Sequence, residues 1–96
     1  MDLWFVYIAR CNDGSLYTGI ARNVTERICA HDAGRGARYT RGRGPLALCA
    51  TRRCHSKTMA LRLELAIKGL TRSQKEAIAD PSALREFAKG WARKLR

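Results

Sequence analysis

Four side chains suited to phosphate chemistry lie close together in the first third of the chain. Tyr7 and Tyr17 are ten residues apart, and Arg27 and His31 follow at the spacing of one helical turn. A guanidinium offers a planar, permanently charged fork that matches phosphate oxygens. Phenols and an imidazole can position or transfer protons, and ordinary cores rarely gather all of these groups. We therefore expect a site that acts on a phosphate group.

The two tyrosines share one face of a sheet only if their hairpin has the correct register. Residues 3–10 and 15–21 have the aromatic and branched composition of strands, with an Asn-Asp-Gly turn signal at residues 12–14. A two-residue turn would place the phenols on opposite faces. A three-residue loop pairs Tyr7 with Gly19, which brings both phenols to one face beside small residues. We predict the three-residue loop.

A helix is expected directly after the hairpin. Asn23 is a good N-cap and Glu26 occupies the capping-box position, so we predict a helix that runs to about residue 33. At about 100° per residue, one stripe of this helix should face inward. That stripe consists of Val24, Arg27, Ile28 and His31. The basic residue and the histidine on an apolar stripe require an explanation.

The remaining elements follow from turn and capping signals. We predict a strand at residues 46–51, helices at 57–69 and 71–79, and a last helix from Pro81 with a clear apolar face. The predicted order is β-β-α-β-α-α-α. No internal repeat or interdomain linker is visible, and 96 residues correspond to one domain.

Composition indicates a polyanionic partner. The formal charge is +11 and the pI is near 10.4, which favours nucleic acid first and an anionic membrane surface second. A hydrophobic content of 46% argues against a disordered basic tail. No stretch is long enough to span a bilayer, and the N-terminus lacks the pattern of a signal peptide. We expect a cytoplasmic protein with reduced thiols and no membrane association.

An arginine- and glycine-rich loop is expected between the first helix and the third strand. Within residues 34–45 the basic residues are Arg35, Arg38, Arg41 and Arg43. They could form a nucleic-acid-binding clamp in which glycines allow close approach to the phosphate backbone. They could equally be a solvated basic loop, and the residues alone leave both readings open.

Five elements in register carry a resemblance to a known family. They are the segments Phe5-Val6-Tyr7 and Tyr17-Thr18-Gly19, the residues Arg27 and His31, and Glu64 in the second long helix. Over residues 3–78 the chain resembles the GIY-YIG nuclease superfamily, in particular its small, stand-alone bacterial members. It is also similar to the nuclease domain of the Slx1 structure-specific endonucleases.

This resemblance implies an α+β fold with a three-stranded antiparallel sheet flanked by helices. Residues 1–80 would form the nuclease domain, with residues 81–96 as an amphipathic helix packed on it. Glu64 would hold Mg²⁺ or Mn²⁺, and Arg27 would contact the scissile phosphate. Tyr7, Tyr17 and His31 would handle protons and position the attacking water.

Each of these side chains also has a structural explanation. Tyr7 and Tyr17 could be ordinary strand aromatics, and Arg27 could extend past its neighbours to solvent. Glu64 could serve only as an i,i+4 partner of Lys68. The resemblance departs from the family pattern at Ile20, where some members carry a lysine.

The function that we expect is metal-dependent hydrolysis of phosphodiester bonds in DNA, either structure-selective or independent of sequence, in repair or recombination. Contacts to the DNA backbone should dominate, because the chain carries no evident second domain that reads bases. The alternatives are a non-catalytic nucleic-acid-binding module and a subunit of a repair complex. A protein partner would then dock on the apolar face of the last helix.

Overall fold

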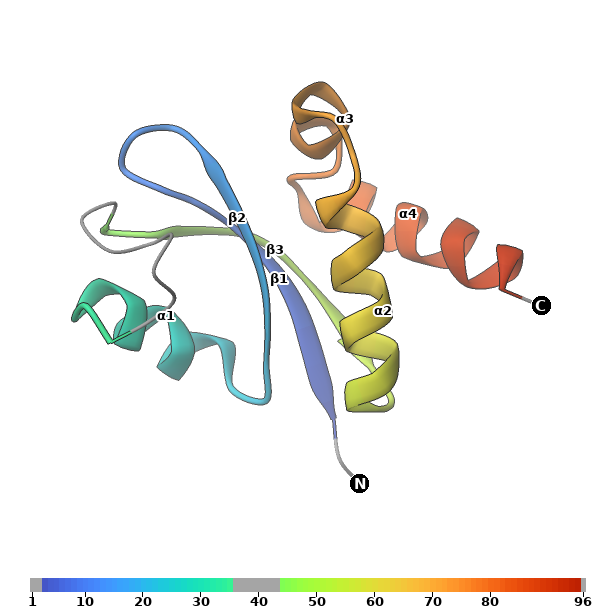
Figure 1. Cartoon of the computed structure of the whole chain (residues 1–96), viewed down its shortest axis with the longest axis horizontal. Coiled ribbons are helices and arrows are strands. Elements are labelled where there is room, and N and C mark those ends of the chain that lie inside the picture. Colours follow the sequence, from blue (N-terminus) through green and yellow to red (C-terminus); the bar gives the residue numbers. More distant parts are fainter. Residues whose placement is uncertain (1–2, 36–43, 96) are drawn as a thin grey trace.

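The computed structural model describes residues 3–35 and 44–95 and has the predicted order of elements (Figure 1). The elements are β1 (Trp4–Arg10), β2 (Leu16–Ala21), α1 (Val24–Asp32), β3 (Ala47–Cys54), α2 (Lys57–Lys68), α3 (Arg72–Ala77) and α4 (Pro81–Lys94). Three antiparallel strands form one sheet in the order β2-β1-β3. The predicted α+β fold is therefore confirmed.

The hairpin has the register that the three-residue loop predicts. Tyr7 is paired with Gly19 and Ala9 with Tyr17. The backbone amide of Cys11 donates to the carbonyl of the residue after the loop at 2.7 Å, and Gly14 takes a φ of 87°. A positive φ is readily adopted only by glycine, so Gly14 allows the chain to reverse here. Both phenols consequently lie on the same face.

The third strand is longer than predicted. It continues to Cys54 because the central strand β1 pairs with it along its whole length, with Trp4 opposite Cys54. Arg52 and Arg53 follow the end predicted at residue 51, and their charge concealed the strand. Pairing with a central strand thus overrides the local sequence preference.

Helices cover both faces of the sheet (Figure 1). On one side α1 covers a small cluster consisting of Tyr7, Ala9, Cys11, Ala21 and Leu46, with Tyr17, Val24 and Ile28 against it. On the other side α2 and α4 cover the main cluster, consisting of Val6, Ile8, Ala50, Cys54, Ala60, Leu63, Ile67, Ile78, Leu84 and Ala88. The alternation of side chains along β1 therefore supplies both clusters.

The helix starts confirm the predicted caps. The side chains of Asn23, Ser56 and Asp80 each accept a hydrogen bond from the backbone amide three residues later. A complete capping box between Thr71 and Gln74 starts α3. At Asn23 the structure shows this first half of the expected box. Local side chains therefore set where each helix begins.

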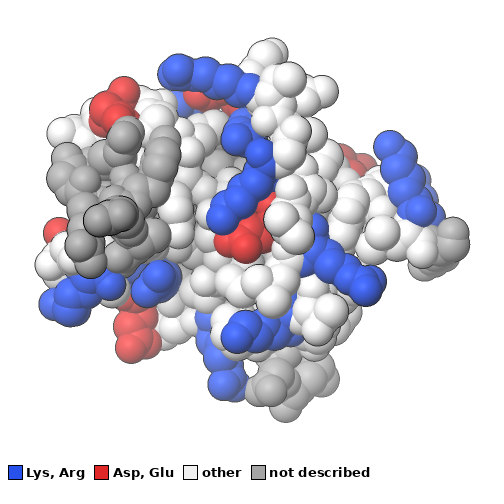
Figure 2. Space-filling model, viewed as in Figure 1, with Lys and Arg blue, Asp and Glu red and all other residues white. Residues whose placement is uncertain are grey.

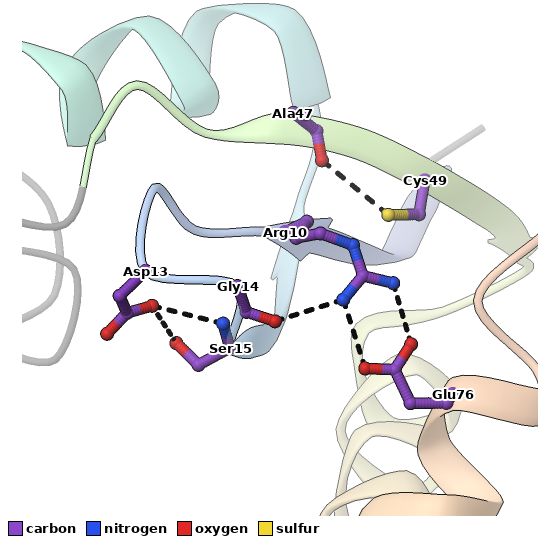
Figure 3. Close-up of polar contacts among 7 residues, drawn as sticks. All are labelled: Arg10, Asp13, Gly14, Ser15, Ala47, Cys49 and Glu76. Atoms are coloured by element: carbon purple, nitrogen blue, oxygen red, sulfur yellow. Dashed lines mark hydrogen bonds and ion pairs between the residues drawn. The ribbon is translucent and has the colours of Figure 1, made fainter.

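A bidentate ion pair attaches α3 to the hairpin. Figure 3 shows the Arg10 guanidinium, whose two terminal nitrogens lie 2.6 and 3.0 Å from the Glu76 carboxylate oxygens. The same guanidinium donates to the carbonyl of Gly14 at 3.0 Å. None of the six residues of α3 is buried, so this contact orients a helix with little apolar anchorage. Both partners are more than one third exposed, so its stabilisation is small.

The helices within residues 3–35 and 44–95 are all too short or too polar to cross a membrane. The division into a nuclease domain at residues 1–80 and a helix at residues 81–96 stays a prediction. Leu84 and Ala88 of α4 belong to the main cluster, so this helix shares the core of the preceding elements.

Two leucines of α2 provide a test of this packing. Leu63 is 1% exposed in the main cluster, whereas Leu65 is 70% exposed on the same helix. We expect Leu63→Ala to lower the free energy of unfolding by about 2–5 kcal/mol, because the cavity collapses only in part. The control Leu65→Ala should change it by about 0.5 kcal/mol or less. Urea unfolding measures both, and equal losses would contradict this packing.

Candidate active site

Three rings from three elements pack against one another on the α1 side of the sheet. Tyr7 of β1 is completely buried and His31 of α1 is 2% exposed. The Tyr7 hydroxyl lies 2.9 Å from Nε2 of His31, within hydrogen-bond distance. The centroid of the Tyr17 ring of β2 lies 6.1 Å from that of the Tyr7 ring and 5.1 Å from that of the imidazole. Tyr17 and the imidazole are arranged edge to face. The predicted phenols and imidazole are therefore brought together.

The space for these rings depends on the absence of a side chain at Gly19. A Cβ atom there would lie 2.6 Å from the Tyr7 hydroxyl oxygen and 3.0 Å from the Tyr17 ring. Both distances are below normal van der Waals contact, so the Tyr7 ring would have to move. The backbone opposite Tyr7 is thus part of the site.

Arg27 lies one turn before His31 and is half-buried. Its positive charge influences both phenols and the imidazole, which places its guanidinium close to all three. The predicted inward direction of Arg27 is therefore observed. A cation in this position can contact a phosphate that enters beside the phenols.

The environment opposes ionisation of both phenols. Burial is the main cause that raises the pKa of Tyr7 above its usual value, and the negative charge of an ionised Tyr17 adds to it. Burial also raises the pKa of Tyr17. Arg27 lowers both values, while the Glu64 carboxylate raises both. At neutral pH both groups are therefore hydroxyls that donate and accept hydrogen bonds.

The imidazole of His31 is held in its neutral form. Burial lowers its pKa below the usual 6.5, and the charge of Arg27 lowers it further, against a smaller opposite effect of Asp32. A neutral imidazole has one nitrogen that accepts and one that donates. It can thus exchange a proton with the Tyr7 hydroxyl.

Glu64 approaches the phenols from the opposite side of the sheet. It lies on α2, a helix that contacts β2, whereas the phenols face α1, and the charge of its carboxylate influences both phenols. Its side chain is only 16% exposed, and one carboxylate oxygen lies 3.4 Å from the Lys68 ammonium. The carboxylate that was predicted to bind a metal is therefore close enough to both phenols to affect their pKa values.

The donor set fits a cation that takes most of its ligands from water and substrate. Within residues 3–35 and 44–95, no three His, Cys, Asp or Glu side chains gather closely enough to hold a metal ion together. Mg²⁺ commonly binds through one or two carboxylates, with phosphate oxygens and water completing its octahedron. Glu64 can supply that carboxylate. A site of this kind requires the substrate for its completion.

A basic pocket lies beside Tyr17 of β2. It has a volume of about 280 Å³ and is lined by Leu16, Tyr17, Thr18, Lys68 and Lys75. Figure 2 shows a small acidic patch near the middle of one face of the molecule, with basic side chains around it. The pocket thus combines a phenol with two cations, as a phosphate backbone would require.

Sequence reasoning missed part of this neighbourhood. Lys68 was expected only as a helical partner of Glu64, and Lys75 was not expected at all. Nothing in the spacing of α2 and α3 places them near Tyr17, because the contact depends on how these helices pack. Arg35 follows α1 and is exposed, while Arg38, Arg41 and Arg43 lie outside the described residues.

Replacement of Gly19 tests the tight contact with Tyr7. We expect Gly19→Ala to lower the free energy of unfolding by about 1–3 kcal/mol, because the added methyl group overlaps a buried ring. Gly90 is a matched control, since a Cβ there would meet nothing within 4 Å. Gly90→Ala in a helix should be neutral or stabilising by up to about 1 kcal/mol. Chemical denaturation checks both, and the idea fails if Gly19→Ala is harmless.

Buried neutral His31 should make stability depend on pH. The pKa of the folded state is lower than that of the unfolded chain, so the unfolded chain binds the proton first. The contribution of neutral His31 to the free energy of unfolding is fully present above about pH 6.5. It is lost as the pH falls from that value towards the pKa of His31 in the folded state. The slope of unfolding free energy against pH between 7.5 and about 5 should be smaller in His31→Gln. Equal slopes in the wild type and in His31→Gln would contradict this effect of the buried imidazole.

Comparisons with known proteins identify the family of this chain. The model of the GIY-YIG catalytic domain matches residues 3–77. UPF0213 proteins of Natronomonas pharaonis and Staphylococcus epidermidis are each 49% identical, over 77% and 78% of this chain and 87% and 92% of their own lengths. The solution NMR structure of a UPF0213 protein from Bacillus halodurans is 50% identical, with a TM-score of 0.51, over 77% of this chain and 79% of that one. Similarity to Slx1 in particular stays a prediction. The chain belongs to the GIY-YIG family.

Proposed function

We propose that the protein is a divalent-metal-dependent endonuclease that hydrolyses phosphodiester bonds in DNA. The observation that carries the proposal is the cluster of Tyr7, Tyr17 and His31, whose two phenols are influenced by the charges of Arg27 and Glu64. Family membership supports a nuclease, because the matching domain is described as catalytic. The metal, the choice of DNA and the role in repair or recombination are parts of the proposal.

Arg27 is proposed to hold the scissile phosphate. Hydrolysis joins a water oxygen to phosphorus and breaks one P–O ester bond, and negative charge accumulates on the phosphoryl oxygens in the transition state. A fixed guanidinium next to these oxygens stabilises that charge without reorganisation. Partial burial of Arg27 strengthens this effect by keeping water away.

Glu64 is proposed to hold the cation, which supplies positive charge to the non-bridging oxygens when it is bound. The carboxylate has restricted freedom, because it is largely buried and contacts Lys68. Lys68 partly neutralises Glu64 before the cation and the phosphate arrive.

The two tyrosines are proposed to have different roles. Tyr17 is half-buried and lines the basic pocket, so its hydroxyl can orient the attacking water. Tyr7 is fully buried and hydrogen-bonded to His31, so it positions the imidazole. Because His31 is uncharged at neutral pH, it can accept the proton that the water loses. In this assignment neither tyrosine has to lose its proton, so the raised pKa values of the phenols do not hinder the reaction.

Binding is proposed to occur through the phosphate backbone. The charge of +11 and the pocket with Lys68 and Lys75 favour contacts that carry no sequence information. Selectivity would then come from the shape of the DNA, as structure-selective repair or recombination enzymes require. Affinity should fall steeply with salt concentration.

A non-catalytic nucleic-acid-binding module is the second candidate. It is favoured by one observation, that both phenols have raised pKa values and neither is prepared to act as a base. A docking subunit receives less support, because Phe87 and Trp91 of α4 pack against the main cluster of the same chain. Cleavage assays separate the first two candidates.

Cleavage of supercoiled plasmid and of branched DNA with Mg²⁺ or Mn²⁺ tests the proposal. Arg27→Ala and Glu64→Gln should each lower the rate by about 100-fold or more, since each removes charge stabilisation of the transition state. Arg85→Ala and Glu86→Gln, two exposed positions of α4, are matched controls that should retain the rate of the wild type.

Far-UV circular dichroism verifies that all four variants are folded. Metal-independent binding without cleavage would support the binding module instead. Equal cleavage by wild type, Arg27→Ala and Glu64→Gln would remove the basis for this site.

A further inference from the structure

A second pocket lies at the other end of β2, next to the same arginine. It has a volume of about 410 Å³, and its lining includes Trp4, Ile20, Arg22, Glu26 and Arg27. Arg27 therefore borders both the phenol cluster and this pocket. Among the described residues that line the pocket, Glu26 alone is acidic, and only Arg27 has a role in the hydrolysis described above.

Trp4 is the aromatic group of this pocket. Its side chain packs against the main cluster and is half-buried. The Arg22 guanidinium carbon lies 5.9 Å from the ring centroid, and the Lys57 ammonium lies 5.1 Å from it. An aromatic ring with exposed cations close to it is an arrangement that can bind the base and the flanking phosphates of one nucleotide.

We propose that Trp4, Arg22 and Lys57 form a subsite for a nucleotide that flanks the scissile phosphate, with its nucleobase stacked on Trp4. The proposal rests on the proposed function for its ligand, a nucleic acid strand. Arg27 links the two sites, since it borders the phenols on one side and the Trp4 pocket on the other. In this proposal the nucleic acid strand runs along β2 from the pocket with Lys75 to the pocket with Trp4.

The two cations do not exclude a base from the ring. Arg22 and Lys57 are exposed side chains, and their contacts with Trp4 are weaker than stacking of a base on an indole. On binding, a base replaces a cation on the ring, and the displaced cation can pair with a neighbouring phosphate. The base must have left its own stack, so a rigid duplex would occupy the subsite poorly.

Intrinsic fluorescence tests the proposal in the full-length protein without metal, so that no cleavage occurs. The chain has two tryptophans, and Trp91→Phe leaves Trp4 as the only one. A single-stranded deoxyoligonucleotide of about ten nucleotides should quench Trp4 saturably. An oligonucleotide of the same length with abasic positions retains the phosphates but lacks the bases, so it should not quench the emission of Trp4. In Trp4→Phe, the emission of Trp91 on α4 should remain unchanged.

Affinity provides a second measurement, by anisotropy of the labelled oligonucleotide. Trp4→Ala should weaken binding about 5- to 100-fold, as expected for loss of one stacked base. Because Trp4 also packs on the core, the quenching experiment with Trp4 intact remains the decisive one. Binding without quenching, equal quenching by the abasic strand, or no binding at all would overturn the subsite.

These results separate the subsite from the proposed catalysis. Quenching of Trp4 by a protein that cleaves no DNA would support the subsite and reject the nuclease. Cleavage that depends on Glu64, in a protein whose Trp4 emission is unaffected by the strand, would support the nuclease and reject the subsite.

Discussion

The Tyr7 phenol can occupy its position beside His31 only because Gly19 faces it without a side chain. That one close approach requires the hairpin to pair Tyr7 with Gly19, and a shift of the pairing by one residue would place the two phenols on opposite faces of the sheet. The three-residue loop with Gly14 at positive φ sets this register. Backbone geometry at two glycines therefore decides whether the candidate site exists.

The outer edge of β2 is the place where the two sides of the sheet meet. Tyr17 and Arg27 belong to the α1 side, while Glu64 and Lys68 come from α2 on the other side. An edge strand is open to solvent and to a ligand, unlike the central strand β1. A long polyanion can therefore contact groups from both sides at once, with basic pockets at either end of the strand.

Burial and the positive charge of Arg27 act in opposite directions on the pKa values of the two phenols and in the same direction on the pKa of His31. Burial keeps both phenols protonated, while Arg27 favours their ionisation and keeps His31 neutral. A phosphate and a cation that enter this site would change that balance, because each adds a charge to a place with little water. The chain alone thus holds its proton-transfer groups in neutral, hydrogen-bonded forms.

The sequence by itself determined the order of elements, the helix caps and the hairpin register, because these depend on neighbouring residues and on turn chemistry. It also determined that Arg27 and His31 face inward, since helical periodicity is local. Tertiary structure alone decided that Glu64 of α2 lies close enough to influence both phenols, that Lys75 and Trp4 line pockets beside β2, and that β3 extends to Cys54. These contacts join segments far apart in the chain, and they follow from how α2 and α3 pack and from pairing along β1, which no local pattern encodes.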